Sequence, residues 1–185
     1  MKKIVITFGL IGGVMISALM LANVAVAKQV GFDKAIFIGY TAIVLSFLMV
    51  FFGIRSYREN VGNGYISFGR AFAVGSLIML ITSVCYVLSW EVVYFNLMPD
   101  FLNDYSNYLV EQMRAAGETQ QAIDAKQQEM RDFKKLYDNP LLNPLITLTE
   151  PLPVGLLITF ISSLVLRRKR ADDSPTNDPA QRMAV

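Results

Sequence analysis

The sequence has no histidine and only one cysteine among its 185 residues. Without histidine there is no histidine-ligated metal or haem, and no catalytic pair in which histidine serves as the base. The one cysteine, Cys85, lies inside an apolar run, so neither an internal disulfide nor a cysteine-rich metal site can form. The sequence therefore predicts no metal site and no cofactor.

Charged residues are also scarce. They make up 17% of the chain, whereas apolar residues make up 54% and the mean hydropathy is +0.42. Soluble domains carry about 25% charged residues. The net charge is only +2, and most basic residues stand in short clusters at the ends of apolar runs. This composition argues against a nucleic-acid partner and indicates an integral membrane protein in contact with the lipid bilayer.

Four apolar runs are each long enough to cross a bilayer, which takes about 20 residues in a helix. They cover residues 4–27, 35–54, 71–95 and 145–166. Because lipid cannot satisfy free backbone groups, all four are predicted to be helices. The sequence thus predicts an all-α, four-helix transmembrane bundle that forms one integral membrane domain over residues 1–170.

The first apolar run has two interpretations. Lys2 and Lys3 precede it and residues 25–27 read Ala-Val-Ala, a pattern typical of a cleaved signal peptide. The run of about 20 apolar residues is longer than the 7–15 usual for such a peptide, which favours a retained span. Both interpretations remain open at this point, and both give the rest of the chain the same orientation.

Basic residues predict the orientation of the spans, since they favour the cytoplasmic side. With four spans, one side receives every dense basic cluster, namely Lys2, Lys3, Arg55, Arg58, Arg70 and residues 167–170. Both termini are therefore expected in the cytoplasm. The segment 97–150 faces the other side and carries nine acidic but only five basic residues. The polar tail, residues 171–185, has almost nothing to bury and is predicted to be disordered and cytoplasmic.

Residues 98–139 contain two amphipathic helical patterns separated by Gly117. Their apolar positions are Phe101, Tyr105, Tyr108, Leu109 and Met113, followed by Ile123, Met130, Phe133, Leu136 and Tyr137. This arrangement predicts an extracytoplasmic helical hairpin between the third and fourth spans. Each apolar stripe needs a partner surface. That surface is either the other helix and the membrane-embedded bundle, or a second protein or second copy of this chain.

Two carboxylates interrupt the apolar runs, and charged groups inside spans are costly enough to mark candidate functional residues. Glu91 lies near the outer end of the third span, and Glu150 lies in the outer half of the fourth. If the two meet, they form a shared proton or cation site, because neighbouring carboxylates raise one pKa. Alternatively, each meets water or accepts hydrogen bonds from helix amides. Pro151 follows Glu150 and predicts that a helix kinks or begins there, and Tyr86 is expected to reach the interface or Glu91.

The second loop combines arginines with glycines beside the membrane. Arg55, Arg58 and Arg70 are candidate contacts for an anionic lipid headgroup or phosphate. The simpler interpretation is a turn that carries the positive charge expected on the cytoplasmic side. A P-loop is excluded, because no Gly-Lys-Ser/Thr sequence is present, and the spacing of Gly62 and Gly64 is only a weak signal of a dinucleotide-binding loop.

Small residues recur at four-residue spacing on the first span, at Gly9, Gly13 and Ser17. Ala35 with Gly39, and Ala71 with Gly75, repeat the spacing on the next two spans. Such stripes let helices approach closely. They predict helix packing, either within the bundle or at a dimer interface.

Several segments together resemble an uncharacterised bacterial membrane family, the domain of unknown function 4199. They are residues 53–58 (Gly-Ile-Arg-Ser-Tyr-Arg), 66–72 (Ile-Ser-Phe-Gly-Arg-Ala-Phe), Trp90-Glu91 and 150–156 (Glu-Pro-Leu-Pro-Val-Gly-Leu). The resemblance spans nearly the whole chain, to about Arg170. It implies a four-helix protein of the bacterial inner membrane that retains its first span, and it assigns no activity or catalytic residue.

From these observations we expect a non-enzymatic inner-membrane protein that acts as a structural or interaction module. The alternative is a small transporter or an ion- or proton-coupled component that uses Glu91 and Glu150. An intramembrane enzyme is disfavoured, since the spans contain neither histidine nor a Ser-Lys or paired-Asp motif.

Overall fold

The computed structural model describes residues 1–168. Its long helices are α1 (Lys2–Val30), α2 (Phe32–Asn60), α3 (Phe68–Val92) and α7 (Pro151–Leu166). Four segments are long and apolar enough to cross a membrane, namely Lys2–Ala27, Phe32–Asn60, Phe68–Leu97 and Asn143–Leu166. The all-α fold with four candidate spans is therefore confirmed. The predicted disordered tail, residues 171–185, lies outside the described residues.

The first two spans form a tight helical hairpin. Only Gly31 separates α1 from α2, and its φ of 83° lies in the left-handed region that glycine adopts without strain. The loop expected at residues 28–34 is thus reduced to one residue. At the other end, α2 continues past the apolar run to Asn60, where Arg55 and Glu59 form an i,i+4 ion pair of 3.0 Å on an exposed helical turn.

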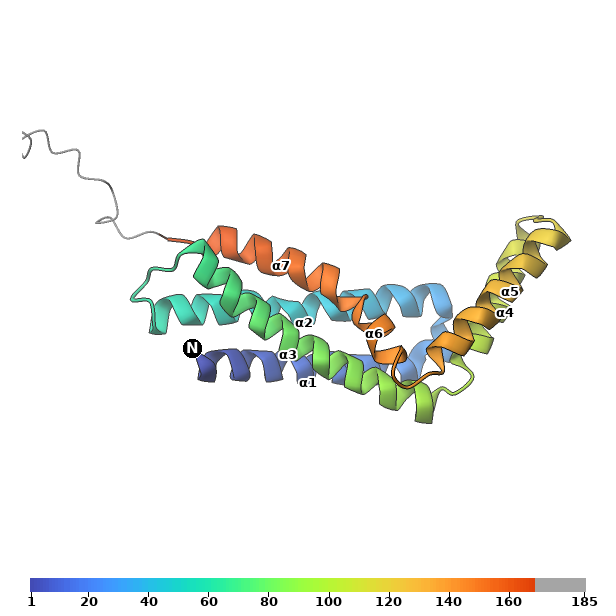
Figure 1. Ribbon diagram of the computed structural model, residues 1–185, viewed down its shortest axis with the longest axis horizontal. Coiled ribbons are helices and arrows are strands. Elements are labelled where there is room, and N and C mark those ends of the chain that lie inside the picture. The colour runs from blue at the N-terminus through green and yellow to red at the C-terminus, as the bar shows by residue number, and fades with distance from the viewer. Residues whose placement is uncertain (169–185) are drawn as a thin grey trace, which may run out of the picture.

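The fourth span is divided into two helices. The short α6 (Asn143–Leu148) ends before Glu150, and α7 begins at Pro151. Proline is well tolerated at the first position of a helix, where its missing N–H leaves no bond unmade, but it cannot continue the helix before it. Figure 1 shows α6 turned away from the line of α7, so Glu150 stands at the corner between them.

Two further helices, α4 (Phe101–Ala115) and α5 (Gln120–Tyr137), extend from the end of the bundle opposite the N-terminus (Figure 1). A π-helical segment, η1 (Val93–Leu97), prolongs α3 toward them. Gly117, with a φ of 76°, forms the turn between α4 and α5. The Thr119 side chain then accepts a 3.3 Å hydrogen bond from the Ala122 N–H and so caps α5.

Small residues bring α1 onto α3. A β-carbon at Gly9 would lie 2.8 Å from Ile81, and one at Gly13 would lie 2.5 Å from the Sγ atom of Cys85. One turn further along, the Ser17 and Ser89 hydroxyls are 2.7 Å apart and share a hydrogen bond. The structure therefore places this stripe at a contact inside the bundle.

The pair of small residues on α3, Ala71 and Gly75, also lies at a close helix contact. A β-carbon at Gly75 would lie 2.8 Å from Thr159 of α7 and 2.9 Å from Ile54 of α2. Fully buried side chains of α2 and α3 surround this point, namely Phe47, Val50, Ile54, Val74 and Ile78. One closely packed part of the core thus lies where α2, α3 and α7 meet, in the half of the bundle that contains the N-terminus.

Candidate functional site

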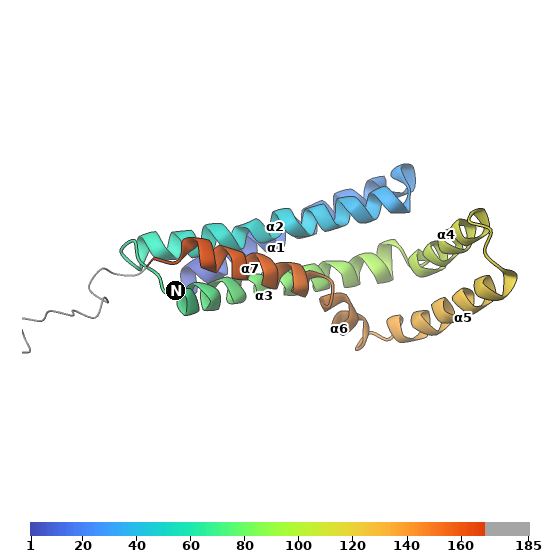
Figure 2. The ribbon, with the colours of Figure 1, turned by 90° about the horizontal axis from the view of Figure 1, so that it is seen from above.

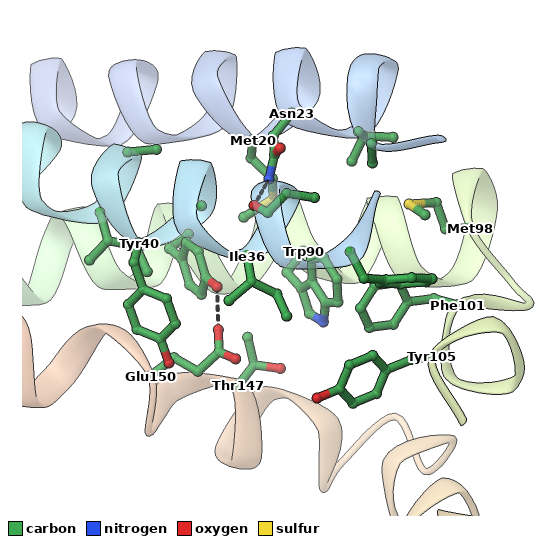
Figure 3. Close-up of a pocket in the computed structure, with 18 of the residues that line it drawn as sticks. Met20, Asn23, Ile36, Tyr40, Trp90, Met98, Phe101, Tyr105, Thr147 and Glu150 are labelled. Carbon is green, nitrogen blue, oxygen red and sulfur yellow. Dashed lines mark hydrogen bonds between the residues drawn. The ribbon is translucent and has the colours of Figure 1, made fainter. Parts of the chain in front are cut away.

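At the other half of the bundle the helices separate. Figure 2 shows α1 and α2 diverging from α3 toward the end that carries α4 and α5. A cavity of about 680 Å³ lies there and is lined by residues from α1 through α6 together with Glu150 (Figure 3). Most of the lining is apolar or aromatic, so we take this cavity as the candidate site.

The cavity exists partly because small side chains of α2 face it without packing closely. Ala35 and Gly39 both line it. A β-carbon at Gly39 would meet only the Nδ2 atom of Asn23, at 3.5 Å. Asn23 donates from Nδ2 to the Ala35 carbonyl at 2.9 Å, but its Oδ1 atom is buried and has no hydrogen-bond partner among the described residues. The same residue spacing that lets α3 pack closely against α2 and α7 therefore leaves space beside α2 at the cavity.

Glu150 contributes a carboxylate to the cavity lining. The Tyr86 hydroxyl on α3 donates a short hydrogen bond to its Oε2 atom, drawn as a dashed line in Figure 3. The Glu150 side chain does not cap α7. The break before Pro151 thus turns the carboxylate toward α3, and the Oε1 atom accepts no hydrogen bond from the described part of the chain.

Glu91 occupies a different environment. It does not line the cavity, and its Oε1 atom is buried with no hydrogen-bond partner among residues 1–168. Within the same described residues no hydrogen bond joins it to Glu150. Tyr86, expected to reach the interface or Glu91, instead bonds Glu150, because positions five apart on a helix point about 140° away from each other.

A hydrogen-bonded circuit fixes the wall opposite α1 and α2. Trp90 donates from Nε1 to the Tyr137 hydroxyl at 2.6 Å, and this hydroxyl lies 2.9 Å from Oγ1 of Thr147. Thr147 donates its only hydroxyl proton to Oδ1 of Asn143 at 2.9 Å, so Tyr137 must be the donor to Thr147. Asn143 closes the circuit by donating to the Tyr137 carbonyl at 3.0 Å. The circuit ties α3, α5 and α6 together.

Burial raises the pKa of Tyr137 above its ordinary value, although its hydrogen bonds to Thr147 and Trp90 act in the opposite direction. The phenol therefore stays protonated at physiological pH and remains a donor in the circuit.

Aromatic rings of α4 close the cavity at the end where α1 turns into α2. The Phe32 ring lies 6.1 Å from the ring of Phe101, 5.7 Å from that of Tyr105 and 5.2 Å from that of Tyr108, between centroids. The Tyr108 hydroxyl donates to Oδ1 of Asp33 at 2.5 Å, and this bond raises the pKa of Tyr108. This hydrogen bond and the ring contacts thus hold the turn between α1 and α2 against α4.

A second polar cluster holds the base of α5. The Tyr94 hydroxyl donates to Oδ1 of Asp138 at 2.6 Å, and Lys134 donates to Oδ2 at 2.6 Å. Burial pushes the pKa of Asp138 upward, but the hydrogen bonds from Lys134 and Tyr94 outweigh it and hold the pKa below its usual value. The carboxylate therefore stays ionised and anchors α5 to the end of α3.

The three candidate arginines lie at the opposite end of the bundle. Arg55 and Arg58 both pair with Glu59, at 3.0 and 3.3 Å, and Arg58 also donates to the Leu166 carbonyl at 3.4 Å. Arg70 is exposed, and its side chain has no hydrogen bond or ion pair with any described residue. Arg58 therefore already donates to a carbonyl at the end of α7. The Arg70 side chain makes no such contact within the described residues and is free to bind a ligand.

Comparison with known proteins gives one match. Residues 7–168 match the family described as "Protein of unknown function (DUF4199)". The chain belongs to this family. No curated protein and no solved structure matches the chain. The DUF4199 match confirms the resemblance inferred from the motifs and covers Tyr86, Trp90 and Glu150, but it assigns none of them a role.

Sequence reasoning on this DUF4199 chain selected Glu150 and Pro151 but missed the cavity and most of its lining. The sequence did not indicate the hydrogen bonds among Tyr137, Thr147 and Asn143, because these polar groups meet only after α5 and α6 have folded back onto α3. A partial signal was present in the aromatic residues near the ends of the spans, which suit a membrane interface.

Proposed function

We propose that this protein is a non-enzymatic interaction module of the bacterial inner membrane whose cavity binds a small amphipathic molecule. The observation that carries this proposal is the cavity of about 680 Å³. Its size lies within the range of small-molecule sites, about 300–1,000 Å³, and its apolar lining with a few polar groups is typical of them. An amphipathic ligand would place its apolar part among Ile16, Met20 and Ile43 and its polar part beside Glu150.

The surroundings of the cavity support entry from the lipid phase. Ile36 and Tyr40 line the cavity yet are 43% and 50% exposed. Their neighbour Phe37 is 75% exposed. All three belong to a candidate span, so the surface beside the cavity is apolar and suits contact with lipid. A ligand dissolved in the bilayer would therefore reach the cavity without crossing water.

Trp90 makes this proposal directly testable, because it is the only tryptophan in the chain and it lines the cavity. A bromoalkyl alcohol quenches tryptophan fluorescence on contact, and binding in the cavity predicts quenching that saturates. The variant Gly39→Leu should weaken this quenching at least tenfold, since the new side chain enters the cavity beside Asn23.

The matched control is Gly69→Leu, at a glycine whose β-carbon would meet nothing within 4 Å and which does not line the cavity. It should leave the quenching unchanged. Equal quenching of Trp90 in the unmodified protein and the folded Gly39→Leu variant would show that the amphiphile does not occupy the cavity.

A second candidate function uses the hairpin formed by α4 and α5 as a contact for another protein or a second copy. Apolar side chains are exposed at its base, where Leu136 of α5 is 53% exposed and Leu141, in the turn that follows α5, is 78% exposed. A photocrosslinking residue at Leu136 should then give one distinct product in native membranes, and the same residue at the exposed Ala125 should not. Equal product patterns from both positions would count against a specific contact.

The orientation that we propose places both termini in the cytoplasm and the hairpin outside. The described basic residues Lys2, Lys3, Arg55, Arg58 and Arg70 support it, because they lie toward the end of the bundle opposite the acid-rich hairpin (Figure 1). In a Cys85→Ser background, a cysteine introduced at Gln127 should react with an impermeant thiol reagent in intact cells, and one at Asn63 should not. The reverse pattern would invert the orientation.

The ion-coupled alternative requires Glu91 and Glu150 to act on one path. Their separate surroundings do not favour it, since only Glu150 lines the cavity. The discriminating measurement is a pH-driven flux in proteoliposomes, which this alternative expects and expects to lose in either Glu91→Gln or Glu150→Gln.

A further inference from the structure

The cavity carries negative charge and no described positive charge. Glu150 and Asp104 line it, and none of its described lining residues is lysine or arginine. Tyr86 occupies only the Oε2 atom of Glu150, so the Oε1 atom is left to another donor. These carboxylates attract a cationic group, whereas they repel an anionic group. The charge of the site therefore selects against carboxylate, phosphate and sulfate headgroups.

Aromatic rings supply the second observation. Trp90 and Phe101 meet edge to face with centroids 5.2 Å apart, and Phe101 and Tyr105 stack at 6.3 Å. In the view of Figure 3, Trp90 lies between Glu150 and Phe101, and Tyr105 lies beside Phe101, so the rings extend along the cavity away from the carboxylate. Ring faces attract cations, and a group of rings beside a carboxylate is the arrangement that recognises ammonium groups.

We propose that the cavity binds a bilayer-dissolved amphiphile whose polar head is an ammonium group. The ammonium group lies beside Glu150 and the aromatic rings, and its alkyl chain lies against the apolar residues of α1 and α2, which are Ile16, Met20, Ile36 and Ile43. This inference rests on the proposed function and adds the chemistry of the headgroup to it. The exposed apolar surface at Phe37 makes the bilayer the source of the ligand.

The test compares three bromoalkyl probes of equal chain length that carry an ammonium, a hydroxyl or a carboxylate head. Quenching of Trp90 is titrated in dodecyl maltoside micelles, whose sugar headgroup has no charge. We expect the ammonium probe to reach half-maximal quenching at a concentration about tenfold below that of the alcohol, and the carboxylate probe to bind more weakly than the alcohol.

Two variants assign this preference to the site. Glu150→Gln should reduce the advantage of the ammonium probe over the alcohol to less than threefold. Glu111→Gln removes a carboxylate from the exposed face of α4, outside the cavity lining, and should keep the full advantage. If Glu150→Gln does not fold, Asp104→Asn replaces it, because Asp104 is exposed on α4 and should fold while lowering the same ratio.

The outcomes separate this inference from the proposed function on which it rests. Saturating quenching that is equal for the three heads would overturn the ammonium assignment and leave amphiphile binding in place. An ammonium preference that Glu150→Gln and Asp104→Asn both leave unchanged would also overturn it. No saturating quenching by any of the probes would overturn both the inference and the proposed function.

Discussion

The Tyr86 hydroxyl on α3 donates a hydrogen bond to Glu150, the residue at the corner between α6 and α7. The bond joins two candidate spans at the edge of the cavity, and it connects positions 64 residues apart in sequence. A phenol that donates to a carboxylate stabilises the charged group without adding charge. This contact therefore joins α3 to the corner between α6 and α7 and keeps the carboxylate at the cavity.

Tyr86→Phe should destabilise the bundle, because it removes the hydrogen bond and leaves Glu150 without its donor. A hydrogen bond to a charged group contributes about 1.5–3 kcal/mol. Thermal unfolding in detergent, followed by circular dichroism, should show a lower Tm. Tyr40→Phe is the matched control, since Tyr40 lines the same cavity and donates no hydrogen bond within the described chain. An equal Tm for Tyr86→Phe and the unmodified protein would show that the contact has no energetic role.

Gly13→Ala should destabilise the contact between α1 and α3. The added β-carbon would lie 2.5 Å from the Sγ atom of Cys85 and 2.8 Å from its Cβ atom, which forces the helices apart. Overpacking of this kind costs about 1–3 kcal/mol. Gly69→Ala meets nothing within 4 Å and should leave the Tm nearly unchanged. The double variant Gly13→Ala with Cys85→Gly should recover part of the stability that Gly13→Ala loses. If its Tm is no higher than that of Gly13→Ala, the steric clash lies at another contact.

Asp138→Asn should change stability in a pH-dependent way. The pKa of Asp138 is lowered from its ordinary 3.8, so the folded state favours the charged carboxylate. The resulting stabilisation is fully present above the pKa of the unfolded chain and is lost as the pH falls through the lower folded pKa. The unmodified protein should therefore have a higher Tm than Asp138→Asn at neutral pH, and the difference should shrink at acidic pH. A difference that does not vary with pH would contradict the role of the ionised group.

Arg70→Gln should reduce the amount of anionic lipid that purifies with the protein more than Arg55→Gln does. Glu59 already neutralises much of the charge of Arg55, whereas the Arg70 side chain makes no ion pair with the described residues. Lipid extraction followed by mass spectrometry gives the amounts. If neither variant changes the anionic lipid content, the arginines act only in orienting the chain.

The four candidate spans could be predicted from sequence because hydropathy is a local property. A run of about 20 apolar residues crosses a bilayer whatever its neighbours are. The break at Pro151 was visible for the same reason, since a proline acts on its own turn of helix. The close contact at Gly13 followed from spacing alone, but spacing could not tell whether the partner was α3 or another chain.

The cavity could not be predicted, because it depends on how far helices stand apart. Gly39 and Gly75 have the same small neighbour four residues before them, yet a β-carbon at Gly75 would lie 2.8 Å from Thr159, whereas one at Gly39 would meet only Asn23, at 3.5 Å. The pairing of Tyr86 with Glu150 likewise depends on tertiary contacts between distant positions. The period of the α-helix also excludes the expected contact of Tyr86 with Glu91, since residues five apart do not share a helix face.

Native mass spectrometry of the protein released from its own membrane shows whether the cavity holds a ligand. We expect one retained small amphiphile per chain in the unmodified protein and in Gly69→Leu, and its loss in Gly39→Leu, where the new side chain occupies the cavity. A folded Gly39→Leu variant that retains the same molecule in the same proportion would contradict this expectation.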